Sequence, residues 1–224
     1  MIRVGVHGAT GRMGRLVLPE IEAAPDLELA WACGRELPSP LDADVIIDFS
    51  TPDGLRRLLA QAPCPVVTGT TGMTPAELLA ANPALAVLHS ANFSLGVAVL
   101  ARLVRDAAQA LPGYDIEVVE LHHKHKRDAP SGTALHLVEG LGTVVSGRTG
   151  PRGDGEIGVH AVRGGDIVGE HRVYLSGPGE RLELAHVATH RGLFASGAVA
   201  AARWLVGKPA GLYRIEDVIG GIGG

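Results

Sequence analysis

Apolar positions in the first ninety residues come in short runs separated by longer amphipathic segments. Such runs are typical of strands buried on both faces, and the segments between them have the spacing of helices. Strands are predicted at 2–7, 27–32, 45–49, 65–68 and 84–89. Helices are predicted at 12–24, from about Pro52, and at 75–81. Because the two alternate, the pattern predicts an α/β fold with a parallel sheet covered on both faces.

The pattern changes after the first ninety residues. Further strands are predicted at 115–121, 157–162, 167–175 and 181–187, and helices at 95–111, 133–145 and 194–206. The last three strands are joined by glycine-rich turns, which indicates an antiparallel or mixed sheet and a second domain. The charged, glycine-rich stretch 147–155 is expected to form a mobile loop. A last strand signal is weak, and Gly220–Gly224 is expected to fray.

Composition and charge narrow the classes of function. The 224 residues are 46% hydrophobic and 20% charged, which is typical of a soluble globular protein. The net charge of -4 argues against a nucleic-acid-binding protein, whose binding face is basic. No apolar run reaches the ~18–20 residues of a membrane span, and the strand-like start does not resemble a signal peptide. We therefore expect a cytoplasmic protein with no nucleic-acid or membrane partner.

A glycine motif, Gly8-Ala9-Thr10-Gly11-Arg12-Met13-Gly14, follows the first predicted strand and opens the first helix. Gly8 allows a tight turn, Gly11 lets the backbone approach a pyrophosphate, and Gly14 permits a helix to pack closely on a strand. The spacing is G-x-x-G-x-x-G rather than the more familiar G-x-G-x-x-G, and a purely structural turn is the alternative. The strand before it and the helix after it favour dinucleotide binding.

A residue that recognises the adenosine ribose is expected at the end of the second strand. That end has the sequence Ala32-Cys33-Gly34-Arg35-Glu36. Arg35 is suited to pair with the 2′-phosphate of NADPH, or it is a solvated loop charge. Glu36 is suited to accept hydrogen bonds from ribose hydroxyls, although it lies one or two residues beyond the position expected for such a group. We expect NADPH or NADH to be usable, with a preference for NADPH.

Two further loops follow strand ends, Thr68-Gly69-Thr70-Thr71-Gly72 and Ser90-Ala91-Asn92-Phe93-Ser94. In an open parallel sheet, ligands bind at the carboxyl ends of the strands. Small hydroxyl residues and glycines let backbone groups approach a nicotinamide and its ribose. Each loop alone is compatible with an ordinary turn, but three such loops at one edge of a sheet favour a cofactor site.

The most informative segment runs from Glu120 to Ala134. It contains three His and two Lys in five residues, 122–126, followed by a Pro-Ser-Gly turn and a predicted helix. Such a cationic cluster suits an anionic small molecule, and backbone amides at a helix start bind carboxylate or phosphate. A solvated basic loop capped by Ser131 is the alternative. No His, Asp or Glu spacing in the chain argues for a metal.

These motifs, together with Arg163-Gly164-Gly165-Asp166-Ile167-Val168-Gly169-Glu170-His171, occur in an order that points to one family. The chain closely resembles the 4-hydroxy-tetrahydrodipicolinate reductases (formerly dihydrodipicolinate reductases) of bacterial lysine and diaminopimelate biosynthesis. The resemblance covers nearly the whole chain. Its signature, His-His-x-His-Lys-x-Asp-Ala-Pro-Ser-Gly-Thr-Ala at 122–134, is highly specific.

The resemblance implies an activity and an architecture. NADH or NADPH would reduce the cyclic dicarboxylate made by the preceding synthase, giving tetrahydrodipicolinate and water. A Rossmann-like, doubly wound dinucleotide-binding domain is expected at 1–93. A substrate-binding and oligomerisation domain with an open mixed sheet is expected at 94–191, and a C-terminal return to the first domain at 192–224. The expected partners are a small dicarboxylate and further copies of the chain in a homotetramer.

The resemblance also implies roles for individual residues. The catalytic His falls on His122, and the proton-donating Lys falls on Lys126. Substrate contacts fall on His123, Gly132 and Thr133. Cofactor contacts fall on Gly8, Ala9, Thr10, Gly11, Arg12, Met13, Arg35, Gly69, Thr70, Thr71, Ser90, Ala91, Asn92 and Phe93.

The chain departs from the family at two places. Gly34 stands where many members use an acidic residue on the adenosine ribose, which argues against a strict preference for NADH. The stretch 35–43 is shorter than in many members, and we expect a trimmed surface there with the chemistry intact.

The residues suggest how a reductase would work. Lys126 is a cationic acid with a flexible reach, and repulsion among the neighbouring cations lowers their pKa values, which eases proton donation. Asp128 either orients this loop or is structural. Structural roles are expected for His136, His171 and His186, and a hinge or interface role for Arg191. Another dehydrogenase of an amino acid or sugar, or a nucleotide-sensing regulator, are the alternative functions.

Overall fold

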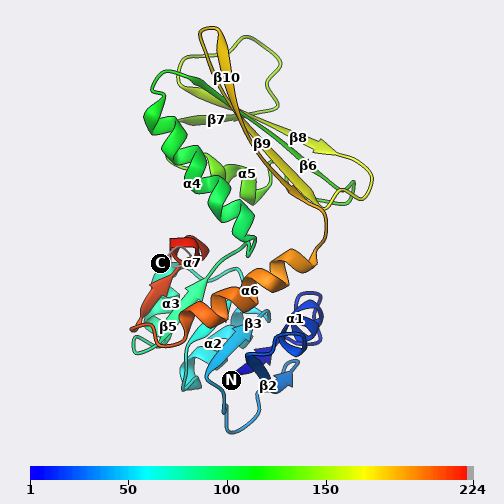
Figure 1. Cartoon of the computed structure of the whole chain (residues 1–224), viewed down its shortest axis with the longest axis vertical. Coiled ribbons are helices and arrows are strands. Elements are labelled where there is room, and N and C mark those ends of the chain that lie inside the picture. Colours follow the sequence, from blue (N-terminus) through cyan, green and yellow to red (C-terminus); the bar gives the residue numbers. More distant parts are fainter. Residues whose placement is uncertain (221–224) are drawn as a thin grey trace. The chain divides into compact units, whose positions relative to one another are not determined.

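A computed structural model of the chain describes residues 1–220, which form two compact units (Figure 1). The first unit contains Met1–Leu95 and the described part of the segment from Gly192 onward, and the second contains Gly96–Arg191. The predicted fraying of Gly220–Gly224 concerns residues that, from 221 on, lie outside the described part. Within residues 1–220, none of the helices is both long and apolar enough to cross a membrane.

A six-stranded parallel sheet forms the centre of the first unit, in the order β11-β5-β4-β3-β1-β2. Its strands are β1 (Ile2–His7), β2 (Leu27–Cys33), β3 (Val45–Asp48), β4 (Val66–Thr68), β5 (Ala86–His89) and β11 (Gly211–Tyr213). Every residue of β3 and β4 is buried, as expected of strands with helices on both faces. The predicted parallel sheet is confirmed.

Five helices complete the first unit: α1 (Gly14–Glu22), α2 (Pro52–Gln61), α3 (Pro75–Ala81), α6 (Gly192–Leu205) and α7 (Ile215–Gly220). Helix α1 packs against α6, and α2 against α3 (Figure 1). Local sequence explains two of the starts, because Thr51 caps α2 and Thr74 forms a capping box with Glu77 at α3. The first helix is shorter than the predicted 12–24, since the glycine loop holds Arg12 and Met13 in a turn.

The second unit contains a five-stranded mixed sheet in the order β10-β9-β6-β8-β7. Its strands are β6 (Asp115–His122), β7 (Thr143–Ser146), β8 (Glu156–Arg163), β9 (Gly169–Gly177) and β10 (Glu180–Ala188). Strand β6 is parallel to β8 and antiparallel to β9, which confirms a mixed sheet. Helices α4 (Leu95–Ala110) and α5 (Gly132–Leu137) cover one face of this sheet (Figure 1).

One predicted element of the second unit is wrong. The helix expected at 133–145 ends at Leu137, and Thr143–Ser146 forms the edge strand β7. Gly140 adopts a left-handed backbone with φ +77°, which stops the helix, and the β-branched run Thr143-Val144-Val145 favours a strand.

Candidate active site

The three loops predicted to bind a cofactor come together in the first unit around the side chain and backbone of Phe49. Gly8, with φ +79°, lies so close that a Cβ there would collide with the Phe49 carbonyl. A Cβ at Gly69 would collide with the Phe49 ring. The Phe49 and Phe93 rings pack edge to face, with centroids 5.5 Å apart. Phe49 therefore holds the loops after β1, β3, β4 and β5 at one edge of the sheet.

A buried carboxylate fixes the geometry of two of these loops. Asp48 is fully buried at the end of β3 and accepts hydrogen bonds from the hydroxyls of Ser50 (2.6 Å), Thr68 (2.7 Å) and Thr70 (2.6 Å). Its Oδ1 also lies 2.8 Å from Nδ1 of the buried His7. Sequence reasoning missed both Asp48 and Phe49. An acidic residue at the end of an apolar strand was the available signal for Asp48.

The glycine loop fits a dinucleotide. The Ala9 amide donates to the Cys33 carbonyl (2.9 Å), which ties the loop to the end of β2, and a Cβ at Gly14 would collide with the Gly8 carbonyl. Gly11 and Arg12 remain exposed at the helix start, where an anionic pyrophosphate binds favourably.

The adenosine end of the predicted site follows β2. Arg35 is exposed there. A Cβ at Gly34 would lie 3.1 Å from Oγ1 of Thr10, so the Thr10 side chain lies where a larger residue 34 would begin. This packing is compatible with a cofactor whose ribose is recognised by Arg35 rather than by residue 34.

In the second unit, the most constrained group is Glu120 on β6, whose side chain is fully buried. Arg163, at the end of β8, donates from Nη1 to Oε2 (2.9 Å) and from Nη2 to Oε1 (2.7 Å). The Ser131 amide donates to Oε1 (3.1 Å), and Nδ1 of His122 contacts Oε2. Burial opposes ionisation of Glu120, but these hydrogen bonds and the nearby positive charge hold its pKa below the ordinary value. Neither Glu120 nor Arg163 was assigned a role from the sequence.

His122 lies at the end of β6, beside His171 of β9. Their ring centroids are 5.2 Å apart in an edge-to-face arrangement. Burial lowers the pKa of His122, and the Glu120 carboxylate acts in the opposite direction. Burial, followed by the charge of His122, lowers the pKa of His171 to about 4, so His171 is neutral at pH 7. Its Nε2 lies 3.3 Å from the Ser131 hydroxyl.

Lys126 and the following turn form a second part of the site. Lys126 Nζ is 2.9 Å from Oδ1 of Asp128, and this contact lowers the pKa of Asp128. The Ser131 hydroxyl caps α5 by accepting from the Ala134 amide (3.1 Å). Gly132 is exposed, and a Cβ there would meet no atom of the protein within 4 Å, so packing does not demand glycine. Helix α5 has only 6 residues, so its dipole is weaker than that of the predicted helix.

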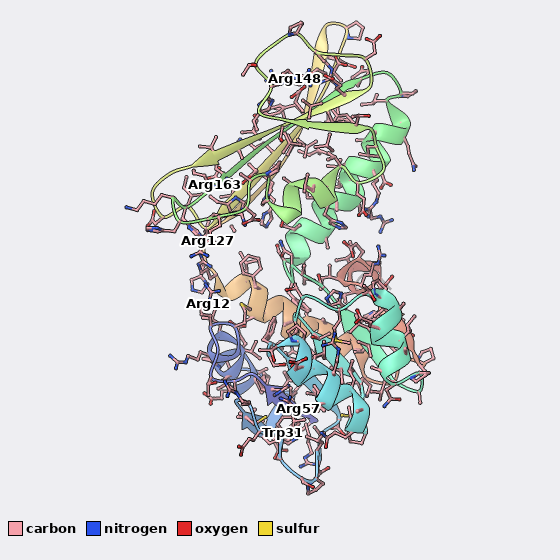
Figure 2. All side chains as sticks on the ribbon, turned by 180° about the vertical axis from the view of Figure 1, so that it is seen from behind. Arg12, Trp31, Arg57, Arg127, Arg148 and Arg163 are labelled. Atoms are coloured by element: carbon pink, nitrogen blue, oxygen red, sulfur yellow. The ribbon has the colours of Figure 1, made fainter. Side chains whose placement is uncertain are left out.

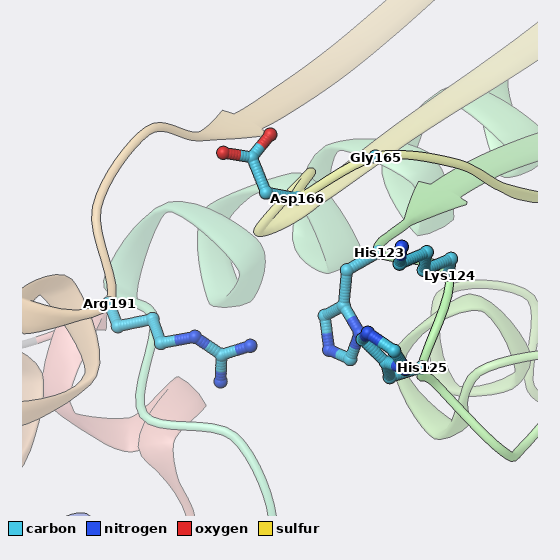
Figure 3. Close-up of a pocket in the computed structure, with 6 residues that line it drawn as sticks. All are labelled: His123, Lys124, His125, Gly165, Asp166 and Arg191. Carbon is cyan, nitrogen blue, oxygen red and sulfur yellow. The ribbon is translucent and has the colours of Figure 1, made fainter.

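A cationic cavity of about 630 Å³ opens beside this segment in the second unit (Figure 3). It is lined by His123, Lys124, His125, Gly165, Asp166 and Arg191. The Arg191 side chain extends towards the His123 ring (Figure 3). Desolvation, and then the charge of Arg191, lowers the pKa of His123. His122, Lys126, Gly132 and Thr133 are not among the residues that line this cavity.

In the described part of the chain, no three His, Cys, Asp or Glu side chains are placed to hold a metal ion together.

Comparison with known families matches nearly the whole chain. The family described as Dihydrodipicolinate reductase, N-terminus, matches residues 2–42 and 37–93, and Dihydrodipicolinate reductase, C-terminus, matches residues 96–219. The two N-terminal matches overlap at residues 37–42. The 4-hydroxy-tetrahydrodipicolinate reductase of Sulfurimonas denitrificans is 42% identical over 253 residues, covering 98% of this chain and 99% of the relative. That of Akkermansia muciniphila is 46% identical over 242 residues, covering 98% of each.

Solved structures show the same fold. A dipicolinate-bound dihydrodipicolinate reductase from Paenisporosarcina sp. TG-14 superposes with a TM-score of 0.78 at 23% identity, over 97% of this chain and 99% of that one. A diaminopimelate dehydrogenase of C. glutamicum superposes with a TM-score of 0.56 at 14% identity, over 96% and 93%. These likenesses confirm a Rossmann-type nucleotide-binding fold with a second mixed sheet. From its sequence matches, the chain belongs to the dihydrodipicolinate reductase family.

Proposed function

We propose that this protein reduces 4-hydroxy-tetrahydrodipicolinate to tetrahydrodipicolinate in the diaminopimelate route of lysine biosynthesis. In this reaction the substrate carbon would gain a hydride supplied by a bound nicotinamide cofactor, one proton would be taken up, and the substrate hydroxyl would leave as water. The observation that carries this proposal is the constellation at the end of β6. There His122, Lys126 and the Ser131–Thr133 turn are linked through Glu120 and Asp128, in a family whose members carry this activity by name.

Each group of the constellation has a chemical task in this proposal. Lys126 donates the proton that accompanies hydride transfer, and His122 acts beside it on the same substrate. The amides of Gly132 and Thr133 hold one carboxylate of the substrate, and His123 contacts the substrate from the cavity side. Asp128 Oδ1 lies 2.9 Å from the Lys126 ammonium, so a substrate carboxylate would compete with Asp128 for the same cation.

The cofactor residues proposed are the glycine loop, Gly69–Thr71 and Ser90–Phe93, which would hold the pyrophosphate, nicotinamide and ribose. When bound, NADH or NADPH supplies the hydride. We propose a preference for NADPH, read by Arg35, which is exposed at the end of β2. Arg35→Ala should abolish that preference, whereas Glu36→Ala should leave it unchanged. A preference for NADH that survives Arg35→Ala would contradict this assignment.

A homotetramer in the cytoplasm is the proposed form of the enzyme. The second-unit sheet supports assembly because its face opposite α4 and α5 leaves two valines exposed near one end of the strands, beside the charged Glu170. Leu121 pairs with Val162, and both Val162 (43% exposed) and Val187 (48% exposed) are open to solvent. Sedimentation velocity of wild type and of Val162→Glu tests this, since a tetramer that depends on this face should dissociate in the variant.

The activity is tested by following NADPH, then NADH, at 340 nm with substrate made in situ by the synthase from pyruvate and aspartate semialdehyde. Wild type should oxidise either cofactor only when the synthase is present. Lys126→Met should lose most of kcat, while Lys208→Met, a lysine stacked on Trp204 in the first unit, should not. Cofactor binding without any oxidation by folded wild-type protein would contradict the proposal and indicate a sensor or another substrate.

A further inference from the structure

Glu120 has no spare capacity to accept hydrogen bonds. A carboxylate offers two acceptor oxygens, each able to take about two donors. Oε1 receives the Ser131 amide and Nη2 of Arg163, and Oε2 receives Nη1 of Arg163 and contacts Nδ1 of His122. Three of these donors cannot lose their hydrogen at neutral pH. A protonated Glu120 could give its hydrogen only to Nδ1 of His122, and it would then face the Arg163 guanidinium without a negative charge. The two-pronged ion pair with Arg163 therefore favours the carboxylate form.

An ionised Glu120 leaves only one arrangement for the His122 ring. Its Nδ1 must carry a hydrogen and donate it to Oε2, because two acceptors facing each other in a buried site would repel. Nε2 is then the nitrogen that gains and loses a proton. Gly169 of β9 leaves room for it, since a Cβ there would lie only 3.1 Å from Nε2.

We propose that Glu120, held by Arg163, is a positioning residue that fixes the tautomer of His122 and so makes Nε2 the atom that acts on the substrate. The same carboxylate binds the Ser131 amide, so it also sets the position of the turn before Gly132 and Thr133 relative to His122. The inference rests on the proposed function, because it assigns a way of working to the His122 of that reaction. Besides Glu120, the charged and titratable groups that act on this ring are Lys126, Arg163 and His171.

The sheet provides a matched control on its opposite face. Glu117, also on β6, contacts Nη1 of Arg152 and lies 2.8 Å from Nε2 of His160. This second Glu–His–Arg trio has the same chemistry, but the Glu117 and His160 side chains are 29% and 41% exposed. Its carboxylate faces the other ring nitrogen, so it favours the opposite tautomer in the neutral ring.

The tautomers can be measured in wild-type protein by ¹⁵N NMR of labelled histidines, with His122 and His160 assigned from His122→Asn and His160→Asn spectra. In the neutral rings, His122 should show a protonated Nδ1 and an unprotonated Nε2, whereas His160 should favour a protonated Nε2. This measurement needs no Glu120 variant and no substrate. A neutral His122 with its hydrogen on Nε2 would overturn the inference.

Glu120→Gln then tests what the tautomer does. The Gln amide keeps the shape but replaces one acceptor oxygen with a donor group, which should move the His122 hydrogen towards Nε2 and lower kcat at least about tenfold. NADPH affinity should change less than about twofold. Glu117→Gln should alter the His160 signals, leaving His122 and kcat unchanged. An unaltered His122 tautomer with wild-type kcat in Glu120→Gln would also overturn the inference.

The two proposals fail in distinguishable ways. If wild-type protein does not oxidise cofactor with this substrate, the proposed function fails while the tautomer of His122 and its response to Glu120→Gln remain measurable. If wild type is active but His122 does not respond to Glu120, the function stands and the positioning role is wrong. Should Glu120→Gln not fold, the wild-type NMR measurement still decides.

Discussion

Strand β6 supplies the glutamate of two Glu–His–Arg trios, one on each face of the sheet, and the two trios differ in burial and in hydrogen bonding. Glu120 faces α4 and α5 with the buried residues Ile116 and Val118, and its side chain has no exposure. Glu117 faces the other side of the sheet and is 29% exposed. Alternation along a strand, with a period of two, separates them. The comparison teaches that residue types alone do not let such a trio orient a functional side chain. The carboxylate must also be buried and have all its hydrogen-bond acceptor sites filled.

The two arginines of these trios, Arg163 and Arg152, contact the same sheet in different surroundings. Arg163 lies at the end of β8 (Figure 2). Both its Nη atoms donate to Glu120, and Nη2 also donates to the Asp128 carbonyl (2.7 Å). Arg152 lies in the loop between β7 and β8, with Asp115 as a further partner (2.9 Å). Arg163 thus connects the buried carboxylate to the loop that carries Lys126.

The largest effect on stability should come from removing the arginine of the buried trio, and removing the arginine of the exposed trio provides the comparison. Arg163→Met leaves the Glu120 charge buried without its counter-charge and should lower the free energy of unfolding by roughly 3–5 kcal/mol. Arg152→Met should cost only about 1 kcal/mol, because water screens Glu117. Urea unfolding of both variants near pH 7 measures the difference. Equal losses would show that the two trios are energetically alike and would break the comparison.

The second largest effect should be a loss of folding stability at low pH, caused by the buried His171. The pKa of His171 is about 4 in the folded protein and about 6.5 when unfolded, so the unfolded state binds more protons between these values. The contribution of His171 to the free energy of unfolding is therefore fully present above about pH 6.5. It falls by roughly 3 kcal/mol as the pH decreases towards 4. Unfolding free energies at pH 7, 6, 5 and 4.5 measure it.

His171→Asn supplies the control for this acid effect. The slope of stability against pH between 6.5 and 4 should flatten in the variant, because the group that takes up the proton on unfolding is absent. An equal slope in wild type and variant would place the acid sensitivity elsewhere in the molecule.

A smaller effect should follow from crowding the His122 ring. Gly169→Ala places a methyl group 3.1 Å from Nε2, tighter than an ordinary contact, and should reduce kcat by about tenfold with NADPH affinity unchanged. Gly164→Ala is the matched control, since a Cβ there meets nothing within 4 Å. If both alanine variants turn over like wild type, Nε2 is not the acting atom.

The smallest effect should come from an exposed carboxylate in the same site. Asp128 is 56% exposed and Lys126 is 21% exposed, so their ion pair is worth at most about 1 kcal/mol. Asp128→Asn frees the Lys126 ammonium and should lower KM for the dicarboxylate by no more than about fivefold, with stability nearly unchanged. A tenfold or greater loss of kcat would instead make Asp128 as important as Glu120.

Much of this architecture could be predicted from local signals. Buried apolar runs located five of the six strands of the first unit, all except β11. Strand ends followed by glycines and small hydroxyl residues located the loops that meet around Phe49. The helix predicted at 133–145 failed because two glycines and a β-branched run follow Leu137. Glu120 and Arg163 both lie within motifs that the sequence shows, but their contact could not be predicted. It joins residues 43 positions apart and depends on the parallel register of β6 and β8.

The most direct test of the buried trio is the pH dependence of kcat/KM in wild type, Glu120→Gln and Glu117→Gln. The Glu120 carboxylate raises the pKa of His122 against the lowering effect of burial, so its removal should lower that pKa further. The limb of the profile that reports His122 should move to lower pH in Glu120→Gln and stay in place in Glu117→Gln. Profiles that coincide for all three proteins, or that move equally in both variants, would contradict a special role for the buried trio.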